Sequence, residues 1–372
     1  MTGAPSVADG RGATAIASGV HFEDLARTFA RPPVVGMVSY DASQPSFRLR
    51  MHALRPLLER EGVIARTIEF GRKREWIRIA RNARQMRSCD LLIFQQVKLL
   101  CGERGLVRRM CPVWALDVDD AVMYSRPRAA GRPASTAAWR QRRFRKMAAQ
   151  CGVVVAGSDT LRRMVEAASR RVEVLRTPVD LAAYPPAPLP ERKRIRLAWI
   201  GLGGNLDYLE QVAPVLHRLR ADGAEIELRV ISDRGPAIRG IPTVLVRWSA
   251  AAEGNALAEC DIGLAPLPDD PWHRGKAGFR CIQYAAAGLP TVTSPVGANA
   301  EIVGNGETGI WARSLEEWHA ALTRLHGDVA LRRQMGAAAR RRAREYGLEP
   351  YARRYANLIA DLLSVGTSRV RV

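Results

Sequence analysis

The chain has 372 residues, a length that favours two domains of ordinary size. Apolar residues make up 47% and charged residues 25%, which excludes a chain that is disordered throughout. The 57 Lys and Arg residues against 37 Asp and Glu give a formal charge of +20, so a polyanionic partner or an anionic substrate has to be considered.

Nothing in the composition indicates a membrane span or a secreted protein. No stretch reaches the roughly 18 consecutive apolar residues that a spanning helix needs. The first thirty residues begin without a basic segment and contain Asp9, Glu23 and Asp24, unlike a secretory signal. The six cysteines lie far apart without zinc-ligand spacing, so we expect reduced core residues and no metal site. We therefore expect a cytoplasmic protein.

The first half of the chain alternates strands and helices after a polar leader over residues 1–30. Strands are expected at 34–40, 64–70, 90–96, 111–120, 152–158 and 172–178. Helices are expected at 48–63 (closed by Gly62), 76–87, 102–110 and 159–169. Unbroken apolar strands between helices predict a parallel sheet covered on both faces, which is a doubly wound α/β domain over residues 31–183.

Four prolines in the eleven residues 184–194 predict a semi-rigid linker. A second parallel α/β domain is expected at 195–345, and an amphipathic helix with a tail at 346–372. The strands of this second domain are expected at 195–201, 225–232, 242–248, 261–267 and 289–295. Its helices are expected at 206–223, 251–260, 277–288 and 314–328. Two such domains face a cleft between the carboxyl edges of their sheets, where open α/β sheets bind ligands.

Arginines are concentrated at 126–145 and 331–345. Such runs bind polyanions or solvate helices, and both explanations stay open. Basic helices of this kind also suggest peripheral contact with an anionic membrane on its inner face, at ~1 kcal/mol per cation near the surface. We expect no specific nucleic acid partner.

The most informative segment runs from Ile262 to Gly297. Within it, Lys276, Arg280 and Gln283 are spaced i, i+4, i+7 and would share one stripe at the start of a helix. Such a helix points free N–H groups and the positive end of its dipole into the crevice, where two cations add charge-assisted hydrogen bonds to a phosphate. A solvated helix face explains the same spacing equally well.

This segment resembles the donor-binding element of the retaining family 4 (group 1) glycosyltransferases. The resemblance rests on P-L-x-D-x-P-W-x-R-G-K-x-x-F-x-x-x-Q-Y from Pro266, with weaker similarity at 171–184, 199–209 and 297–322, and it covers about 34–363. It implies the GT-B fold: two doubly wound parallel-sheet, Rossmann-like α/β domains that face a cleft, with a C-terminal helix. The first domain would bind the acceptor and the second the nucleotide sugar.

The resemblance implies transfer of a sugar from a nucleoside diphosphate sugar to an acceptor hydroxyl, with retention, in the synthesis of a cell-surface polysaccharide, glycolipid or glycoconjugate. The acceptor would be a saccharide, a lipid-linked molecule or a small molecule. No cofactor or metal is expected, because Lys276 and Arg280 would neutralise the leaving diphosphate. A non-catalytic polyanion-binding protein of this fold and a nucleotide-sugar epimerase are the alternatives.

The chain departs from the family where two glutamates, eight positions apart, bind the donor. Gly275 and Gln283 stand at these places. Gln283 can still hydrogen-bond a ribose diol through its amide. We expect His273, with Asp269 and Asp270, to replace the missing first glutamate.

The glycine turn of the second domain also lacks the Arg and Lys that many relatives place on the pyrophosphate. The backbone of Gly201, Gly203 and Gly204 would approach the donor instead, and Asn205 would cap the next helix or touch the ligand. Asp233 and Trp248 would contact the nucleotide sugar or base. A role for Asp233 in a turn and for Trp248 in the core accounts for these residues nearly as well.

An acidic cluster at Asp117, Asp119 and Asp120 follows a strand of the first domain. We expect it in the cleft, where Asp117 would accept the proton of the acceptor hydroxyl, near the place of a histidine in many relatives. A cation site of the D-x-D kind, which is typical of a different glycosyltransferase fold, and a helix cap with surface acids are the alternatives. Ser46, Arg48 and Arg50 are expected at the start of a helix that faces the same cleft. The alternative is that these arginines only lie on the surface.

Overall fold

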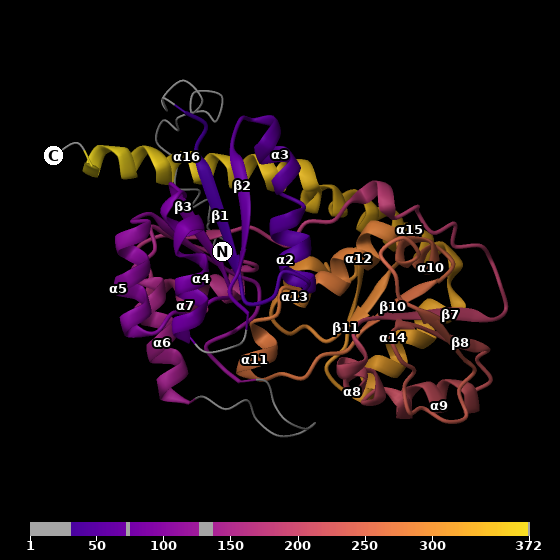
Figure 1. Ribbon diagram of the computed structural model, residues 1–372. Coiled ribbons are helices and arrows are strands. Elements are labelled where there is room, and N and C mark those ends of the chain that lie inside the picture. The colour runs from indigo at the N-terminus through magenta and orange to yellow at the C-terminus, as the bar shows by residue number, and fades with distance from the viewer. Residues whose placement is uncertain (1–30, 72–74, 126–136, 371–372) are drawn as a thin grey trace, which may run out of the picture.

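The computed structural model describes residues 31–71, 75–125 and 137–370, which form two domains side by side (Figure 1). Each domain contains a six-stranded parallel sheet with helices on its faces. The strand order is β2-β1-β3-β4-β5-β6 in the first domain and β12-β11-β10-β7-β8-β9 in the second. The prediction of two doubly wound α/β domains is therefore confirmed.

The first sheet lies in the core of its domain. Its strands are β1 (Val34–Ser39), β2 (Ile64–Glu69), β3 (Leu91–Gln95), β4 (Trp114–Val118), β5 (Val153–Ala156) and β6 (Val172–Val174). The connecting helices are α2 (Pro45–Phe47), the π-helical η1 (Arg48–His52), α3 (Arg55–Arg60), α4 (Glu75–Arg87), α5 (Cys101–Met110), α6 (Ala138–Ala148), α7 (Asp159–Val165) and the 3-10 turn η2 (Glu166–Ala168). The strands β1, β3, β4 and β5 are buried along their whole length, because helices cover both faces.

The second sheet repeats this plan. Its strands are β7 (Ile195–Ile200), β8 (Ile226–Ser232), β9 (Thr243–Arg247), β10 (Ile262–Ala265), β11 (Thr291–Thr293) and β12 (Gly309–Trp311). Its helices are η4 (Gly203–Asn205), α8 (Leu206–Glu210), α9 (Ala213–Ala221), α10 (Glu253–Ala258), α11 (Pro271–Arg274), α12 (Phe279–Ala287), α13 (Ala298–Ile302), α14 (Leu315–Gly327), α15 (Val329–Ala343) and η5 (Arg344–Tyr346). The single helix predicted at 206–223 is observed as α8 and α9, because Pro214 lies in the first turn of α9, where its missing N–H is tolerated.

The chain crosses to the second domain through residues 175–194, which contain the short turn η3 (Leu181–Ala183). Two arginines of α15 hold this crossing segment. Arg340 Nη1 donates to the carbonyl oxygen of Tyr184 at 2.7 Å, and Arg333 Nε donates to that of Leu189 at 3.0 Å. Two arginines of the arginine-rich segment 331–345 therefore stabilise the connection between the domains. Of the first run, residues 126–136 lie outside the described residues, and much of the remainder forms α6.

The chain returns to the first domain through α16 (Leu348–Val370), the yellow helix that runs across that domain in Figure 1. Tyr351, Tyr355 and Ile359 of this helix are buried in one cluster with Met37 and Phe47. The predicted amphipathic terminal helix thus completes the core of the first domain. No helix among the described residues combines the length and hydropathy of a bilayer span.

Each sheet has one point where its strand order reverses. The chain places β2 on one side of β1 and β3 on the other, and in the second domain it places β8 on one side of β7 and β10 on the other. The loops after the two strands at such a point diverge and leave a crevice at the carboxyl end of the sheet. A cavity lies at each of these two points.

Candidate active site

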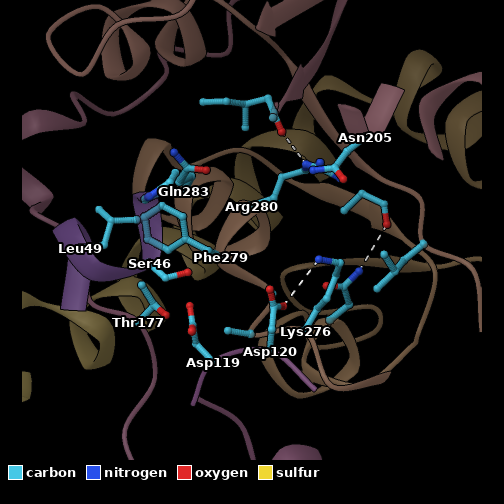
Figure 2. A pocket seen from close by; sticks show the side chains of 18 of the residues that line it. Ser46, Leu49, Asp119, Asp120, Thr177, Asn205, Lys276, Phe279, Arg280 and Gln283 are labelled. Carbon is cyan, nitrogen blue, oxygen red and sulfur yellow. Dashed lines mark hydrogen bonds and ion pairs between the residues drawn. The ribbon is translucent and has the colours of Figure 1, made fainter. Parts of the chain in front are cut away.

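A cavity of about 250 Å³ opens between the domains at the reversal point of the second sheet (Figure 2). Ile200 and Gly201 line it at the end of β7, Ala265 lines it at the end of β10, and Leu267 lines it after that strand. The first domain closes the opposite side with Pro45, Ser46, Leu49, Asp119 and Asp120, and Thr177 of the crossing segment lines the same side. The cavity therefore occupies the interdomain cleft that the sequence predicts.

Lys276 lines this cavity from the connection between α11 and α12. The spacing predicts Lys276 on the first turn of a helix, but α12 begins only at Phe279, after Gly278 with a φ of +67°. This expectation was wrong because Gly278 takes a left-handed conformation, which ends any helix before it. The Lys276 Nζ lies 3.5 Å from Asp120 Oδ1 of the first domain. A dashed line marks this ion pair in Figure 2.

Arg280 lies on the first turn of α12 and lines the same cavity. Its Nε donates to the carbonyl oxygen of Ile200 at 2.5 Å, and its Cζ lies 4.5 Å from the centroid of the Trp199 ring. These contacts hold the guanidinium against the end of β7. A Cβ at Gly201 would lie 2.7 Å from Arg280 Nη2, so the glycine makes room for the arginine.

The beginning of α12 adds a third positive feature. Gly278, Phe279 and Arg280 line the cavity, and no side chain caps the helix. The first N–H groups of a helix have no partner within it, and its dipole places positive charge at this end. Together with Lys276, these groups form a site suited to an anion such as a diphosphate.

Gln283 lies at the inner side of the cavity and is 6% exposed. Its Nε2 donates to the Tyr184 hydroxyl at 3.0 Å, and that hydroxyl donates to Glu253 Oε1 in a short hydrogen bond. Burial and the neighbouring carboxylate of Glu253 raise the pKa of Tyr184, so the phenol stays protonated. With its amide nitrogen engaged, Gln283 retains its carbonyl oxygen as an acceptor. Sequence reasoning missed Tyr184 and Glu253, because their partners lie far away in the chain.

Trp248 does not line the cavity, contrary to expectation. Its Nε1 donates to Glu253 Oε2 at 2.6 Å, and the Cζ of Arg48 lies 5.1 Å from its ring centroid. Trp248 thus fixes the carboxylate behind Gln283 and contacts the first domain through a cation–π interaction.

Asp117 does not reach the cavity either, which corrects its predicted place in the cleft. It is fully buried, and Arg50 binds both its oxygens, with Nε–Oδ1 and Nη2–Oδ2 distances of 2.8 Å. The Tyr355 hydroxyl donates to Asp117 Oδ2 at 3.3 Å. The physical reason is that Asp117 still belongs to β4, whose two faces are covered, whereas Asp119 and Asp120 follow the strand.

Asp119 is the carboxylate that takes the position expected of Asp117. It lines the cavity and is 7% exposed. Its Oδ1 accepts hydrogen bonds from Gln95 Nε2 at 3.1 Å and, in a short contact, from Gln96 Nε2. Both donors use one oxygen, which leaves Oδ2 to face a ligand.

Only part of the glycine turn at residues 201–205 lines the cavity. Of the predicted residues, the cavity is lined by Gly201 and Asn205, but by neither Gly203 nor Gly204. Asp233 Oδ1 accepts a hydrogen bond from Gly203 N at 2.6 Å, and Arg234 Nη2 donates to Gly203 O at 2.8 Å. This bond from the Gly203 N–H lowers the pKa of Asp233. Asp233 therefore supports the turn from behind and does not line the cavity. The Asn205 side chain does not cap α8.

His273 and its neighbours also lie outside the cavity. The His273 ring is buried between Asp270 and Tyr208, with Nδ1–Oδ2 and Nε2–Oη distances of 2.6 and 2.8 Å. Asp270 caps α11, and Asp269 Oδ1 accepts from Arg274 Nε at 2.5 Å. The predicted replacement of the first donor glutamate is therefore not observed. Tyr208, which His273 holds, does line the cavity.

The structure explains why position 275 is a glycine. A Cβ there would lie 2.3 Å from the Cβ of Ala121 in the first domain and 3.0 Å from its Cα. A Cβ at Gly157 would likewise lie 3.2 Å from that of Ala277. Ala121 of the first domain thus occupies the space that a side chain at position 275 would need.

Glu301 joins the domains beside the cavity. It accepts hydrogen bonds from the backbone N–H of Asp159 at 3.0 Å and of Thr160 at 2.7 Å, and from Arg176 Nη1 at 2.7 Å. Although burial acts in the opposite direction, the hydrogen bonds from Thr160 and Arg176 lower the pKa of Glu301. A residue of the second domain therefore caps α7 of the first.

Comparisons with known proteins agree with this geometry. Residues 195–328 match the family model described as "Glycosyl transferases group 1". No curated relative matches the sequence. Sucrose-phosphate synthase from Thermosynechococcus elongatus is similar in structure, with a TM-score of 0.70 and 16% identity, over 90% of this chain and 100% of that one. A glycosyltransferase from Rickettsia africae ESF-5 has a TM-score of 0.68 and 13% identity, over 90% and 99% of the two chains.

Anabaena HepE in complex with UDP and glucose is also similar, with a TM-score of 0.65 and 10% identity, over 88% of this chain and 100% of that one. Identities this low show the fold, and the arrangement of two parallel-sheet domains is that of the GT-B glycosyltransferases. The second domain thus matches the group 1 glycosyltransferase family in sequence, and the two domains together have the GT-B fold of these solved glycosyltransferases.

Proposed function

We propose that this glycosyltransferase moves a sugar from a nucleoside diphosphate sugar to an acceptor hydroxyl, with retention, in the synthesis of a cell-surface polysaccharide, glycolipid or other glycoconjugate. The observation that carries the proposal is the convergence of Lys276, Arg280 and the uncapped start of α12 on the interdomain cavity. The structure of HepE with UDP and glucose supports a donor of this class.

Cleavage of the bond between the anomeric carbon and the phosphate oxygen leaves negative charge on the departing diphosphate. Lys276, Arg280 and the first N–H groups of α12 would stabilise that charge more in the transition state than in the ground state. Because these charges are fixed in the protein, we propose that the reaction needs neither a metal nor another cofactor. The loss of one such group is expected to cost about 3 kcal/mol, or roughly 100-fold in rate.

Two further residues have roles in this proposal. The Gln283 carbonyl accepts a hydrogen bond from the ribose of the donor, and Tyr184 keeps the amide in that orientation. Asp119 Oδ2 accepts the proton of the attacking acceptor hydroxyl, because Oδ1 is already engaged by two amides. The donor would thus be bound mainly by the second domain and the acceptor by the first.

The proposal is tested with purified protein, a panel of nucleoside diphosphate sugars and saccharide acceptors. We expect nucleoside diphosphates to raise the melting temperature by mass action and Lys276→Ala or Arg280→Ala to lower transfer about 100-fold. Arg218→Ala, an exposed change on α9, serves as the control for charge. A product whose anomeric configuration is inverted would contradict retention. Conversion of the donor to an isomer without acceptor would identify an epimerase instead.

We also propose a cytoplasmic enzyme that contacts an anionic membrane peripherally through exposed arginines near the end of α15, such as Arg341 and Arg344. Each cation near such a surface contributes about 1 kcal/mol. Cosedimentation with anionic vesicles at low salt is expected, and its absence would contradict this proposal.

A further inference from the structure

Strand β9 forms one edge of the second sheet, and it is the most exposed of the four edge strands in the described sheets. Four of its five residues are exposed. By contrast, β6 and β12 have only three residues each, none of them exposed, and two of the three exposed residues of β2 are the charged Arg66 and Glu69. Short length and charged side chains protect an edge strand from pairing with another chain. Strand β9 lacks this protection, because its only charged residue, Arg247, stands at its end.

The exposed side chains of this edge are largely apolar. Val244 is 40% exposed and Leu245 46%, and Trp248, directly after the strand, is 36% exposed. Val244 and Leu245 are neighbours in the strand, so their side chains lie on opposite faces of the sheet. Of the nine large hydrophobic side chains that are exposed in the described part of the chain, three thus fall within five consecutive residues. Such a cluster at a sheet edge indicates a surface that binds another protein.

The hydrogen bonds between β8 and β9 determine which backbone groups face outward. Leu228 N donates to the carbonyl oxygen of Pro242 at 2.8 Å. At the other end, Trp248 N donates to that of Ser232 at 3.1 Å. In a parallel pair, alternate residues of a strand bond to the neighbouring strand. The even-numbered residues of β9 therefore bond to β8, and the odd-numbered ones direct their N–H and C=O groups away from the sheet. Within the described ranges, these outward groups form no hydrogen bond.

The outward residues are Thr243, Leu245 and Arg247, a pattern that is symmetric about Leu245. Two identical strands that pair antiparallel across a two-fold axis need such a centre. With the axis at Leu245, this residue lies opposite its own copy and Thr243 lies opposite Arg247, and each pair exchanges two backbone hydrogen bonds. Val244 then lies opposite Val246, so apolar side chains meet apolar ones and the two arginines do not oppose each other. A strand of another protein would not require this symmetry.

We propose that two copies of this chain associate through β9, with the two strands antiparallel and centred on Leu245. The two six-stranded sheets would then form one continuous sheet. Because the strands of the two copies run in opposite directions, the carboxyl edges of their sheets, where the interdomain cavities lie, are on opposite sides of the pair. The inference does not rest on the proposed function, because no residue of β9 lines the interdomain cavity.

Disulfide formation in the variant Leu245→Cys tests the position of the axis. Directly opposite residues of a hydrogen-bonded antiparallel pair have Cα atoms about 5.5 Å apart, which is within the range of a disulfide. With oxidised glutathione, we expect most of this variant to become a linked pair of chains on a non-reducing gel. Ile64→Cys, at a position of the β2 edge that is 42% exposed, is the matched control. It should give no more linkage than the unchanged chain, whose Cys101 is also exposed.

The register is tested by mixing two variants. Thr243→Cys mixed with Arg247→Cys should form a linked pair, because the two-fold axis places these positions opposite each other. Neither variant alone should exceed the unchanged chain. Linkage in the mixture that is no greater than in either variant alone would contradict the register centred on Leu245.

Sedimentation equilibrium tests the association without a covalent link. We expect the mass of the unchanged chain to rise from one copy to two as its concentration is raised. Leu245→Lys should weaken the association about tenfold or more, because two ammonium groups would oppose each other at the axis. Ile64→Lys adds the same charge at another edge and should leave the association unchanged. Titration with UDP checks that both variants keep their fold.

Two results would overturn the proposal. One is the mass of a single copy at every concentration, which would leave the edge to a strand of another protein. The other is association that is equally strong in Leu245→Lys and in the unchanged chain, because the copies would then pair through another surface. Loss of UDP binding in the unchanged chain, with association that still depends on Leu245, would contradict the proposed function alone.

Discussion

The two cavities occupy equivalent points of two similar sheets, yet their charges are arranged differently. In the second domain Arg280 bonds to a backbone carbonyl and lies against the Trp199 ring, and Lys276 faces the carboxylate of Asp120. In the first domain Lys98, which lines the other cavity, bonds to a carbonyl and lies among other cations. The fold thus determines where a ligand binds, whereas the loops after the strands determine which ligand it is.

The largest effect is expected at the carboxylate between the cavities. Asp119→Asn removes the proposed base while it keeps the shape of the side chain, so transfer should fall by about 10²–10⁴-fold with little change in donor affinity. Steady-state kinetics and donor titration measure both quantities. Asp117→Asn is the matched comparison: it breaks a buried ion pair with Arg50 and should lower the free energy of unfolding, by about 3–5 kcal/mol. If Asp119→Asn retained full activity, the assignment of the base would be wrong.

The next largest effect is expected at the contact between Gly275 and Ala121, where the two domains meet. Gly275→Ala places a Cβ 2.3 Å from that of Ala121, so we expect a loss of about 1–3 kcal/mol in stability and reduced transfer. Ala121→Gly in the same chain removes one of the colliding atoms and should restore part of both. Thermal unfolding and activity of the single and double variants measure this. A single variant as stable and active as the unchanged chain would contradict the interdomain contact.

A smaller effect is expected from Glu301, whose pKa is lowered in the folded chain. A lowered pKa means that its contribution to stability is complete above the ordinary value of 4.5 and is lost as the pH falls through the lower, folded value. Glu301→Gln should therefore reduce stability at neutral pH and flatten its dependence on pH below that ordinary value. Thermal melts between neutral and acidic pH compare the two chains. Parallel curves would show that Glu301 does not act as a charged cap of α7.

The smallest effect is expected from metal removal. Because Lys276 and Arg280 are proposed to carry the diphosphate charge, EDTA should leave the transfer rate unchanged. A rate that falls with EDTA and returns with Mg²⁺ would contradict a mechanism without metal.

The sequence predicted most of the fold because the strands are apolar runs between helices, as at Val34–Ser39. It did not locate α6, whose arginine-rich sequence lacks a capping residue and has only three buried side chains, Phe144, Met147 and Ala148. The break between α8 and α9 was missed although Pro214 signals it.

The candidate site was predicted where local spacing was sufficient. Lys276, Arg280 and Gln283 do line one cavity, although the helix starts later than the spacing suggests. Asp117 was misplaced because its partner, Arg50, is 67 residues away in the chain. The same limit applies to His273, whose contact with Tyr208 spans 65 residues. Long-range partners decide whether a polar side chain faces a ligand, and a single sequence does not show them.

The most direct measurement is a calorimetric titration of UDP into the unchanged chain and into Lys276→Ala, Arg280→Ala and the exposed control Arg218→Ala. We predict one UDP site, with affinity reduced about tenfold or more in each of the first two variants and unchanged in the control. UDP affinity that is the same in all four chains would contradict the conclusion that these two cations and the start of α12 hold the diphosphate of the donor.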